Sequence, residues 1–314
     1  MLENILLFLL AGIVLVISGG FLVKSLSKIA EFLGISEFSA AFIIMAIATS
    51  LPELFVGISS AMIGNPQLSL GNVIGANILN LTLITGIIIL VAKEIKFTTK
   101  KIGEDAYLML FSLILMISLY LINKSLSRID GAILLCFFAF NIYRKFARRK
   151  KFRAKIKKEK ALGKKNVGLN MIIFMIALAA LFISSSFAVK YASLLAIDLN
   201  LPKILVGLFM LSIATTLPEL VFGIRAARSE HKVMGIGDQI GTIITNTVLI
   251  IGVVSLIHPI TVEFIPFITS SIFMFISAFI FLTFLKTGKK FETLEGISLI
   301  LIYILFIIIE FFIK

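Results

Sequence analysis

The 314-residue sequence contains no tryptophan, one cysteine and two histidines, and charged residues make up only 15% of it. Because Cys136 is the only cysteine, an intramolecular disulfide is excluded, and with only His231 and His258 besides, a zinc site of His and Cys is unsupported. A bound metal would have to be held by oxygen atoms. The shortage of charge, together with 59% hydrophobic residues, excludes a soluble domain of this size. The sequence therefore predicts a protein that resides in a lipid bilayer.

Uninterrupted apolar runs of about 20 residues recur along the chain, and a helix of this length crosses a hydrocarbon core of roughly 30 Å. Because the runs do not alternate between apolar and polar residues, they are helices and not strands of a barrel. We therefore expect an all-α polytopic membrane protein with ten transmembrane helices. The predicted segments are residues 4–23, 39–63, 68–92, 104–123, 127–146, 168–189, 202–226, 233–257, 261–285 and 294–313. The first segment lacks a positive start and an obvious cleavage site, so we interpret it as a spanning helix and not as a signal peptide.

The net charge of +13 is concentrated in one segment. Thirteen Lys or Arg residues and one acid, Glu159, lie between Arg144 and Lys165. The positive-inside rule places this segment in the cytoplasm, and the loops on the same side bring the total to 25 of the 30 cationic residues. Both termini are then expected outside. We interpret the segment as a linker that sets the topology and contacts membrane lipid, and we do not expect nucleic acid as a partner.

The second half of the chain repeats part of the first at an offset of 166 residues. Residues 48–86 align without a gap to residues 214–252, and 17 of the 39 positions are identical, glycines and an asparagine among them. Each half holds five predicted segments, and an odd number makes the second half enter the membrane from the opposite side. The predicted organisation is a first repeat at 1–147, a basic cytoplasmic linker at 148–167 and a second repeat at 168–314. Inverted repeats are typical of secondary transporters, which expose a midplane site alternately to each side.

Each repeat carries the motif Ala-Thr-Ser/Thr-Leu-Pro-Glu, at residues 48–53 and 214–219. Its glutamates, Glu53 and Glu219, fall near the middle of predicted segments, where an ionised carboxylate costs about 3 kcal/mol or more unless it is compensated. The preceding proline removes a backbone donor, so carbonyl groups one turn earlier are free to bind a cation. Two hydroxyl groups share the helix face of each glutamate: Thr49 and Ser50 in the first repeat, Thr215 and Thr216 in the second. These oxygens suit a hard cation such as Ca²⁺, although a lone Ser or Thr in a membrane helix often bonds back to its own helix.

A second polar element follows in each repeat, at residues 71–80 and 237–246. It starts with glycines that allow helices to approach closely. It ends in Asn80 or Asn246, whose amides either bind ions through their oxygens or join neighbouring helices. The repeat symmetry favours the ion site.

These motifs and their second copies resemble the alpha-repeats of the sodium/calcium exchanger family, and in particular its compact prokaryotic members without a cytosolic calcium-sensing domain. The resemblance implies Na⁺/Ca²⁺ antiport by alternating access, with segments 1 and 6 sliding across the rest and with the ions as substrates and no cofactor. The implied ligands of a central Ca²⁺ are Glu53, Glu219, the carbonyls of Thr49 and Thr215, and the amides of Asn80 and Asn246. The implied Na⁺ sites use Ser50, Thr216, Thr242 and the carbonyls of Ala46 and Ser212. One chain supplies both repeats, so a monomer suffices.

The sequence departs from the family pattern at a few positions. Ala48 and Ala214 replace a glycine, Ala76 stands where the family commonly has a serine, and Asn246 stands where prokaryotic members often have an aspartate. The motifs thus supply two carboxylates, which balance one Ca²⁺ or two protons, whereas three Na⁺ leave one positive charge in excess. Ca²⁺/H⁺ exchange is therefore the alternative, because both glutamates could take up a proton when the metal leaves.

Asp238 stands where the first repeat has Asn72. We interpret it as a residue near the membrane edge that caps a helix or pairs with Arg225 and Lys232, with a place at the entrance of an ion cavity as the alternative. Residues 235–238 also match the Gly-x-Gly-Asp fragment of intramembrane aspartyl proteases, which need a second catalytic aspartate. The remaining aspartates all fall near predicted helix ends: Asp105, Asp130 and Asp198. We therefore expect a transporter and not an enzyme, and the inverted repeats favour it over a channel.

Overall fold

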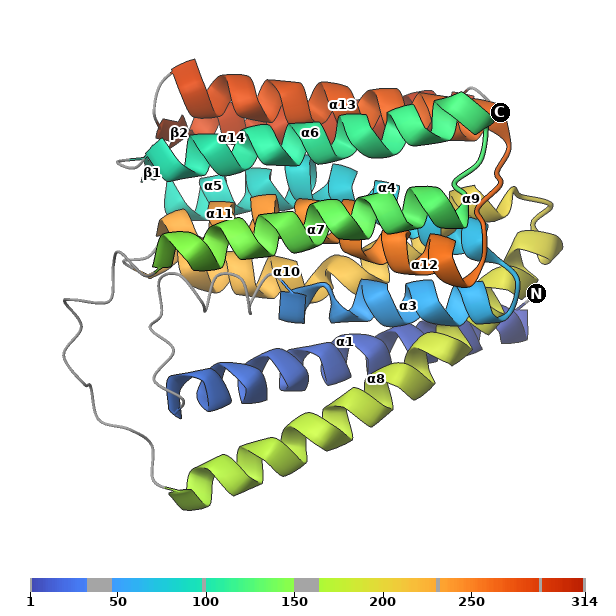
Figure 1. Ribbon diagram of the computed structural model, residues 1–314, viewed down its shortest axis with the longest axis horizontal. Coiled ribbons are helices and arrows are strands. Elements are labelled where there is room, and N and C mark those ends of the chain that lie inside the picture. The colour runs from blue at the N-terminus through green and yellow to red at the C-terminus, as the bar shows by residue number, and fades with distance from the viewer. Residues whose placement is uncertain are drawn as a thin grey trace.

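The computed structural model describes residues 2–32, 47–97, 100–149, 164–229, 232–287 and 290–312, which are almost entirely helical (Figure 1). The α-helices are α1 (Leu2–Phe32), α3 (Leu51–Met62), α4 (Pro66–Leu79), α5 (Thr85–Ala92), α6 (Lys100–Asn123), α7 (Arg128–Arg149), α8 (Lys164–Asp198), α9 (Lys203–Val206), α10 (Ser212–Ala227), α11 (Lys232–Ile244), α12 (Ile251–Ile257), α13 (Phe264–Thr287) and α14 (Thr293–Phe312). Three π-helical segments are η1 (Asn80–Ile84), η2 (Gly207–Leu211) and η3 (Thr245–Ile250). The two short strands are β1 (Glu94–Lys96) and β2 (Lys290–Glu292).

Eight helical stretches in these described ranges are long and apolar enough to cross a membrane, which confirms an all-α polytopic membrane fold. The expected number of ten is not fully confirmed. The segment predicted at 127–146 forms α7, whose first and last turns carry charged residues. The segment predicted at 39–63 is described only from residue 47, and it contains the 12-residue α3. The sequence did not predict the two short strands.

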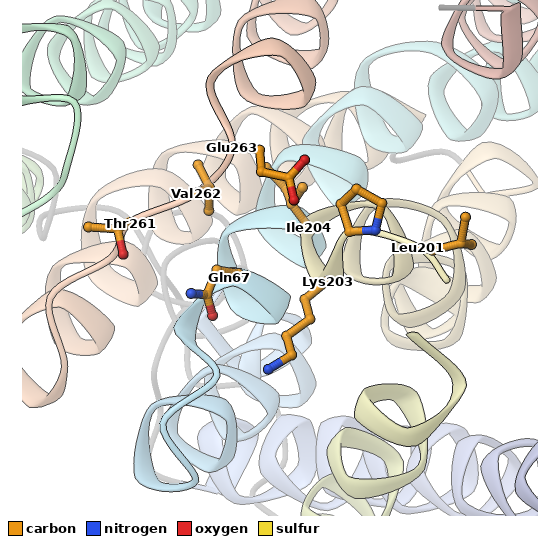
Figure 2. Close-up of a pocket in the computed structure, with 8 residues that line it drawn as sticks. Gln67, Leu201, Lys203, Ile204, Thr261, Val262 and Glu263 are labelled. Carbon is orange, nitrogen blue, oxygen red and sulfur yellow. The ribbon is translucent and has the colours of Figure 1, made fainter. Parts of the chain in front are cut away.

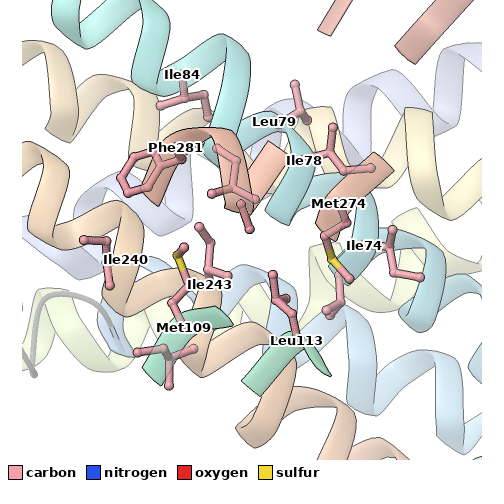
Figure 3. Packing of buried hydrophobic residues seen from close by; sticks show 14 of the residues in the cluster. Ile74, Ile78, Leu79, Ile84, Met109, Leu113, Ile240, Ile243, Met274 and Phe281 are labelled. Atoms are coloured by element: carbon pink, nitrogen blue, oxygen red, sulfur yellow. The ribbon is translucent and has the colours of Figure 1, made fainter. Parts of the chain in front are cut away.

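The helices form a main bundle with a separate pair at its side. α1 and α8 run along each other at one edge of the molecule (Figure 1). Large apolar residues on the outer surface of this pair, such as Ile13, Ile17 and Ile176, are more than half exposed and suit contact with lipid. α4 and α11 occupy the centre, where Ile74 and Ile243 pack with residues of α6 and α13 (Figure 3).

Glycines bring the two repeats into backbone contact at the centre. A Cβ atom on Gly75 of α4 would lie 2.1 Å from the carbonyl oxygen of Leu208 in η2, and one on Gly207 would lie 2.2 Å from that of Leu68. No side chain fits at such distances, so only glycine allows α4 and η2 to approach this closely. This contact sets α10, which follows η2, beside α4.

Two antiparallel contacts show how the halves are related. Glu94 pairs with Glu292 in the β1–β2 ladder, and Leu126 pairs with Ile260 in an isolated bridge. Glu94 and Ile260 are separated by the repeat offset of 166 residues, and so are Leu126 and Glu292. The two contacts are therefore formed by equivalent positions of the two repeats. They lie at opposite ends of the bundle, as inverted repeats require (Figure 1). The exact repeat boundaries at 147 and 168 stay predictions.

Basic residues gather at the end of the bundle that holds β1 and β2. There Arg144 lies 3.8 Å from Asp105, Lys286 lies 3.8 Å from the ring centre of Tyr107, and Lys232 donates to the carbonyl of Ala92 at 2.8 Å. α1 begins and α14 ends at the opposite end (Figure 1). Which end faces the cytoplasm stays a prediction.

Candidate ion-binding site

Glu53 and Glu219 lie inside the bundle with no exposed surface. Helix α1 marks where their motifs meet, because a Cβ atom on Gly19 would lie 3.3 Å from the Cγ atoms of both Pro52 and Pro218. None of the four carboxylate oxygens has a hydrogen-bond partner among the described residues. Leaving an ionised carboxylate buried and unpaired costs about 3 kcal/mol or more, so this arrangement requires bound cations or protons.

Different local breaks position the two motifs. In the first repeat residues 47–49 are helical, Ser50 forms a turn, and α3 begins anew with Pro52 in its first turn. In the second repeat Pro218 lies inside α10, which follows the π-helical η2. A proline donates no backbone hydrogen bond, so each break leaves carbonyl groups without their usual helical partner. The predicted distortion thus occurs in both repeats, as a new helix start in one and an internal proline in the other.

The threonine of each motif contacts the opposite repeat. The Thr215 hydroxyl donates to Oδ1 of Asn72 in α4 at 3.1 Å, and the Thr49 hydroxyl lies 3.4 Å from the Thr242 hydroxyl in α11. Thr215 also faces the glutamate of the first motif, and Thr49 faces the glutamate of the second. Each carboxyl group therefore lies beside a hydroxyl from the other half of the chain.

The remaining hydroxyl groups of the motifs differ in their hydrogen bonds. The Thr216 hydroxyl donates to the Ser212 carbonyl at 2.8 Å, which is the local back-bonding that a membrane helix favours. The Ser50 hydroxyl is buried and has no hydrogen-bond partner among the described residues. Ala76 is fully buried and offers no hydroxyl where its repeat counterpart Thr242 has one. Ala46 lies outside the described residues.

Asn80 and Asn246 occupy equivalent places at the start of π-helical segments. Asn80 is the first residue of η1 and Asn246 the second of η3, and both are fully buried. Single-turn π-helices inside longer helices recur at functional sites. Within the described ranges, neither polar atom of the Asn80 amide has a partner, and the Asn246 oxygen has none. The polar atoms that the sequence placed together are therefore buried and largely unpaired.

A hydrogen-bond chain that the sequence did not predict holds the Asn246 amide. Asn246 Nδ2 donates to Oδ1 of Asn77 at 3.4 Å, Asn77 Nδ2 donates to the Thr247 hydroxyl at 2.9 Å, and Thr247 donates to the Ile243 carbonyl at 2.7 Å. The direction of donation is fixed by the last acceptor, which is a backbone carbonyl. Asn246 consequently engages its nitrogen and keeps its oxygen available. One feature of the sequence points to this chain: Asn77 is a polar residue within an apolar segment, at a position where the second repeat has an isoleucine.

The predicted role of Asp238 as a helix cap or as a partner of Arg225 and Lys232 was wrong. Its side chain is 2% exposed, and neither carboxylate oxygen has a hydrogen-bond partner in the described part of the chain. Lys232 does not pair with it but bonds the Ala92 carbonyl, and Arg225 is exposed. Helix α11 starts six residues before Asp238, so Asp238 lies too far along the helix to cap its first turn.

No second aspartate accompanies Asp238. Asp105 contacts Arg144, Asp130 accepts from Ser127 at 2.8 and 2.6 Å, and Asp198 accepts from Asn4 at 2.8 Å. All three lie near helix ends, so the aspartate pair that an aspartyl protease needs is not formed. In the described ranges, no three His, Cys, Asp or Glu side chains gather closely enough to hold a metal by themselves. A cation at this site would rely on neutral oxygens as well.

A surface pocket of about 480 Å³ lies where α4, α9 and α13 begin (Figure 2). Its lining includes Gln67, Lys203 and Glu263 and none of the residues discussed above. The pocket is therefore separate from the buried carboxylates.

The chain matches a family model described as sodium/calcium exchanger protein over residues 3–147 and 169–312. It is 30% identical to the sodium/calcium exchanger MaX1 of Methanosarcina acetivorans over 98% of each chain, and 28% identical to the inner membrane protein YrbG of Escherichia coli over about 80% of each.

Solved structures show the same fold. A structure of the H⁺/Ca²⁺ exchanger CAX aligns with a TM-score of 0.78 at 18% identity, covering 97% of this chain and 81% of the other. The sodium-calcium exchanger NCX_Mj aligns with a TM-score of 0.69 at 25% identity, covering 97% of each chain. The family match over almost the whole chain, supported by the MaX1 similarity, shows that this protein belongs to the sodium/calcium exchanger family.

Proposed function

We propose that the chain is a secondary antiporter that exchanges Ca²⁺ for Na⁺ by alternating access. The observation that carries the proposal is the pair of fully buried, unpaired carboxylates, Glu53 and Glu219, one from each inverted repeat. Intramembrane carboxylates of this kind mark ion pathways. Because each repeat provides one half of the site, a movement of one repeat against the other exposes it to alternate sides.

The proposed ligands of Ca²⁺ are the two carboxylates and the oxygens beside them. Ca²⁺ takes about six to eight oxygens, so two carboxylates are not sufficient alone. The unpaired Asn80 and Asn246 oxygens and the carbonyls at the motif breaks add neutral ligands. The proposed set for Ca²⁺ comprises Glu53, Glu219, Asn80, Asn246 and the carbonyls of Thr49 and Thr215. The proposed set for Na⁺ comprises Ser50, Thr216, Thr242 and the carbonyls of Ala46 and Ser212.

Ca²⁺/H⁺ exchange is a second candidate. Ala76 removes one hydroxyl from a position whose counterpart, Thr242, has one, and a proton needs fewer ligands than Na⁺. Of the two similar solved structures, one is named as an H⁺/Ca²⁺ exchanger and the other as a sodium-calcium exchanger. The fold itself is therefore compatible with either counter-ion.

The proposed setting is the cell membrane, with both termini outside and the linker at 148–167 in the cytoplasm. Lipid is the proposed partner of the outward-facing apolar residues, and inorganic cations are the substrates. A monomer contains the whole site.

A flux measurement separates the two counter-ions. Purified protein is reconstituted into liposomes loaded with ⁴⁵Ca²⁺, and efflux is started by Na⁺ outside at constant pH or by acid outside without Na⁺. We expect Na⁺ to drive efflux. Efflux driven by acid alone would replace the proposal with Ca²⁺/H⁺ exchange, and efflux without any counter-ion would indicate a channel.

Neutral variants test the two carboxylates. Glu53→Gln and Glu219→Gln should each reduce Ca²⁺ flux by at least about 100-fold, because losing one of two buried charges removes several kcal/mol of Ca²⁺ stabilisation. Glu310→Gln is the matched control, since Glu310 is a buried carboxylate of α14 that accepts from Thr269, and its flux should stay near wild type. Normal flux in either motif variant would rule out the proposed site.

A further inference from the structure

The second repeat contains two buried polar side chains that the proposed Ca²⁺ site does not use. Asp238 is 2% exposed and Gln239 is fully buried, and no polar atom of either side chain has a hydrogen-bond partner among the described residues. The first repeat has Asn72 and Val73 at these positions, so both features belong to the second repeat alone. A buried carboxylate without a partner requires a compensating positive charge.

Helix α11 packs against α10, which carries the second motif. Gln239 Nε2 lies 4.0 Å from the position that a Cβ atom on Gly223 would take, and Gly223 is one turn beyond Glu219 on α10. Asp238 precedes Thr242 by one turn on the same face of α11, and the Thr242 hydroxyl lies 3.4 Å from the Thr49 hydroxyl of the first motif. The repeat relation agrees with this place, because the counterpart Asn72 bonds Thr215 of the opposite motif. Asp238 therefore borders the candidate ion site on the side toward the start of α11.

We propose that Asp238, assisted by the Gln239 side-chain oxygen, is a third cation-binding carboxylate of this site and holds one Na⁺. The inference rests on the proposed Na⁺/Ca²⁺ exchange and deepens it.

With Asp238 included, the site has three carboxylates instead of the two that the motifs supply. Three carboxylates balance three Na⁺, which two carboxylates do not, and they leave one negative charge when a single Ca²⁺ is bound. Exchange of three Na⁺ for one Ca²⁺ thus becomes the stoichiometry that the buried charges favour, and it moves one net charge across the membrane. Removing Asp238 should return the balance to two Na⁺ for one Ca²⁺.

The test compares the wild type with Asp238→Asn, which introduces the residue that the first repeat already has. In proteoliposomes with fixed Na⁺ and Ca²⁺ gradients and a K⁺/valinomycin potential, the voltage at which net ⁴⁵Ca²⁺ flux stops gives the coupling ratio. We expect the wild type to stop at the voltage that corresponds to about three Na⁺ per Ca²⁺. The variant should have no such voltage, because exchange of about two Na⁺ per Ca²⁺ moves no net charge. The matched control Glu310→Gln should keep the wild-type ratio. An unchanged ratio in a transporting Asp238→Asn protein would overturn the role of Asp238.

A binding measurement decides the case if the variant does not transport. Equilibrium dialysis of the purified proteins with ²²Na⁺, without Ca²⁺, should show about one Na⁺ fewer per Asp238→Asn molecule than per wild-type molecule, while size-exclusion profiles remain alike. Equal Na⁺ counts would overturn the inference. Wild-type liposomes without Na⁺-driven flux would contradict the proposed function itself, which is a separate result.

Discussion

The direction of the Asn77 hydrogen bonds decides which atom of Asn246 can face a cation. Thr247 is committed to a backbone carbonyl, so its oxygen accepts from Asn77, and the Asn77 oxygen accepts from Asn246. A cation repels an amide nitrogen and attracts an amide oxygen. Asn77 therefore acts as a positioning residue for Asn246, without itself being a proposed ligand.

Replacing Asn77 tests this role. Asn77→Leu leaves the Asn246 nitrogen without its acceptor, and the loss of one buried hydrogen bond, about 1 to 1.5 kcal/mol, should raise the KM for Ca²⁺ by roughly tenfold. The maximal rate should change much less, since both carboxylates remain. Thr247→Val, which disturbs only the next link, should have a smaller effect. An unchanged KM for Ca²⁺ in Asn77→Leu, or equal losses in KM and maximal rate, would contradict a positioning role.

Residue types and repeat symmetry were enough to select part of the candidate site. Glu53, Glu219, Thr49 and Thr215 stood out because both copies of the motif share them, and the structure buries all four at the meeting of the repeats. The other repeat has Asn72 at the position of Asp238 and Ile243 at the position of Asn77, so repeat identity gave no reason to assign either residue to the site. Their roles depend on the burial depth of α11 and on bonds between the repeats, which are properties of tertiary packing.

Among the elements, α1 meets the prolines of both ion-site motifs at Gly19. A Cβ atom on Gly19 would be 3.3 Å from the prolines of both motifs, whereas one on Gly20 would have no atom within 4 Å. The adjacent glycines thus face opposite environments, and Gly20 is exposed on the outer side of the helix. This pair allows the contact between α1 and the motifs to be tested separately from the helix itself.

Gly19→Leu should slow transport, because the added side chain separates α1 from both prolines. Overpacking of this kind costs about 1 to 3 kcal/mol, and we expect the Ca²⁺ flux to fall by about tenfold or more. Gly20→Leu makes the same chemical change toward lipid and should transport at nearly the wild-type rate. The measurement is initial ⁴⁵Ca²⁺ flux at equal amounts of reconstituted protein. Similar rates in the two variants would show that the α1 contact does not matter for transport.

Helix existence was easier to predict than helix interruption. The long apolar runs gave most spanning helices, but η1, η2 and η3 were not predicted, because a π-helical turn reflects packing rather than a distinct residue pattern. The two motifs show the same limit: Pro52 begins a helix and Pro218 lies inside one, although the local sequences are nearly identical. The difference comes from what precedes each motif and from the opposite repeat.

Across the whole molecule, the inverted repeats make the two ends of the bundle similar in fold but different in charge. The backbone pairing of Glu94 with Glu292 at one end is equivalent to the pairing of Leu126 with Ile260 at the other end. A pair of acidic residues at one end thus corresponds to a pair of apolar residues at the other. At the charged end, Lys290 lies between Glu94 and Glu292, and these acids raise the pKa of the Lys290 ammonium. We expect this charge difference to orient the chain in the membrane.

This charge difference predicts that the end with β1 and β2 faces the cytoplasm. Two exposed lysines report on the two ends: Lys96 in β1 and Lys124 in the loop after α6. In a Cys136→Ala background, which removes the only native thiol, Lys124→Cys should react with a membrane-impermeant maleimide on intact cells. Lys96→Cys should react only after the membrane is permeabilised, because the basic residues from 144 to 165 hold that end inside. The reverse labelling pattern would place the termini in the cytoplasm and would invert the side from which each ion enters. Labelling of both positions on intact cells would indicate a mixed orientation.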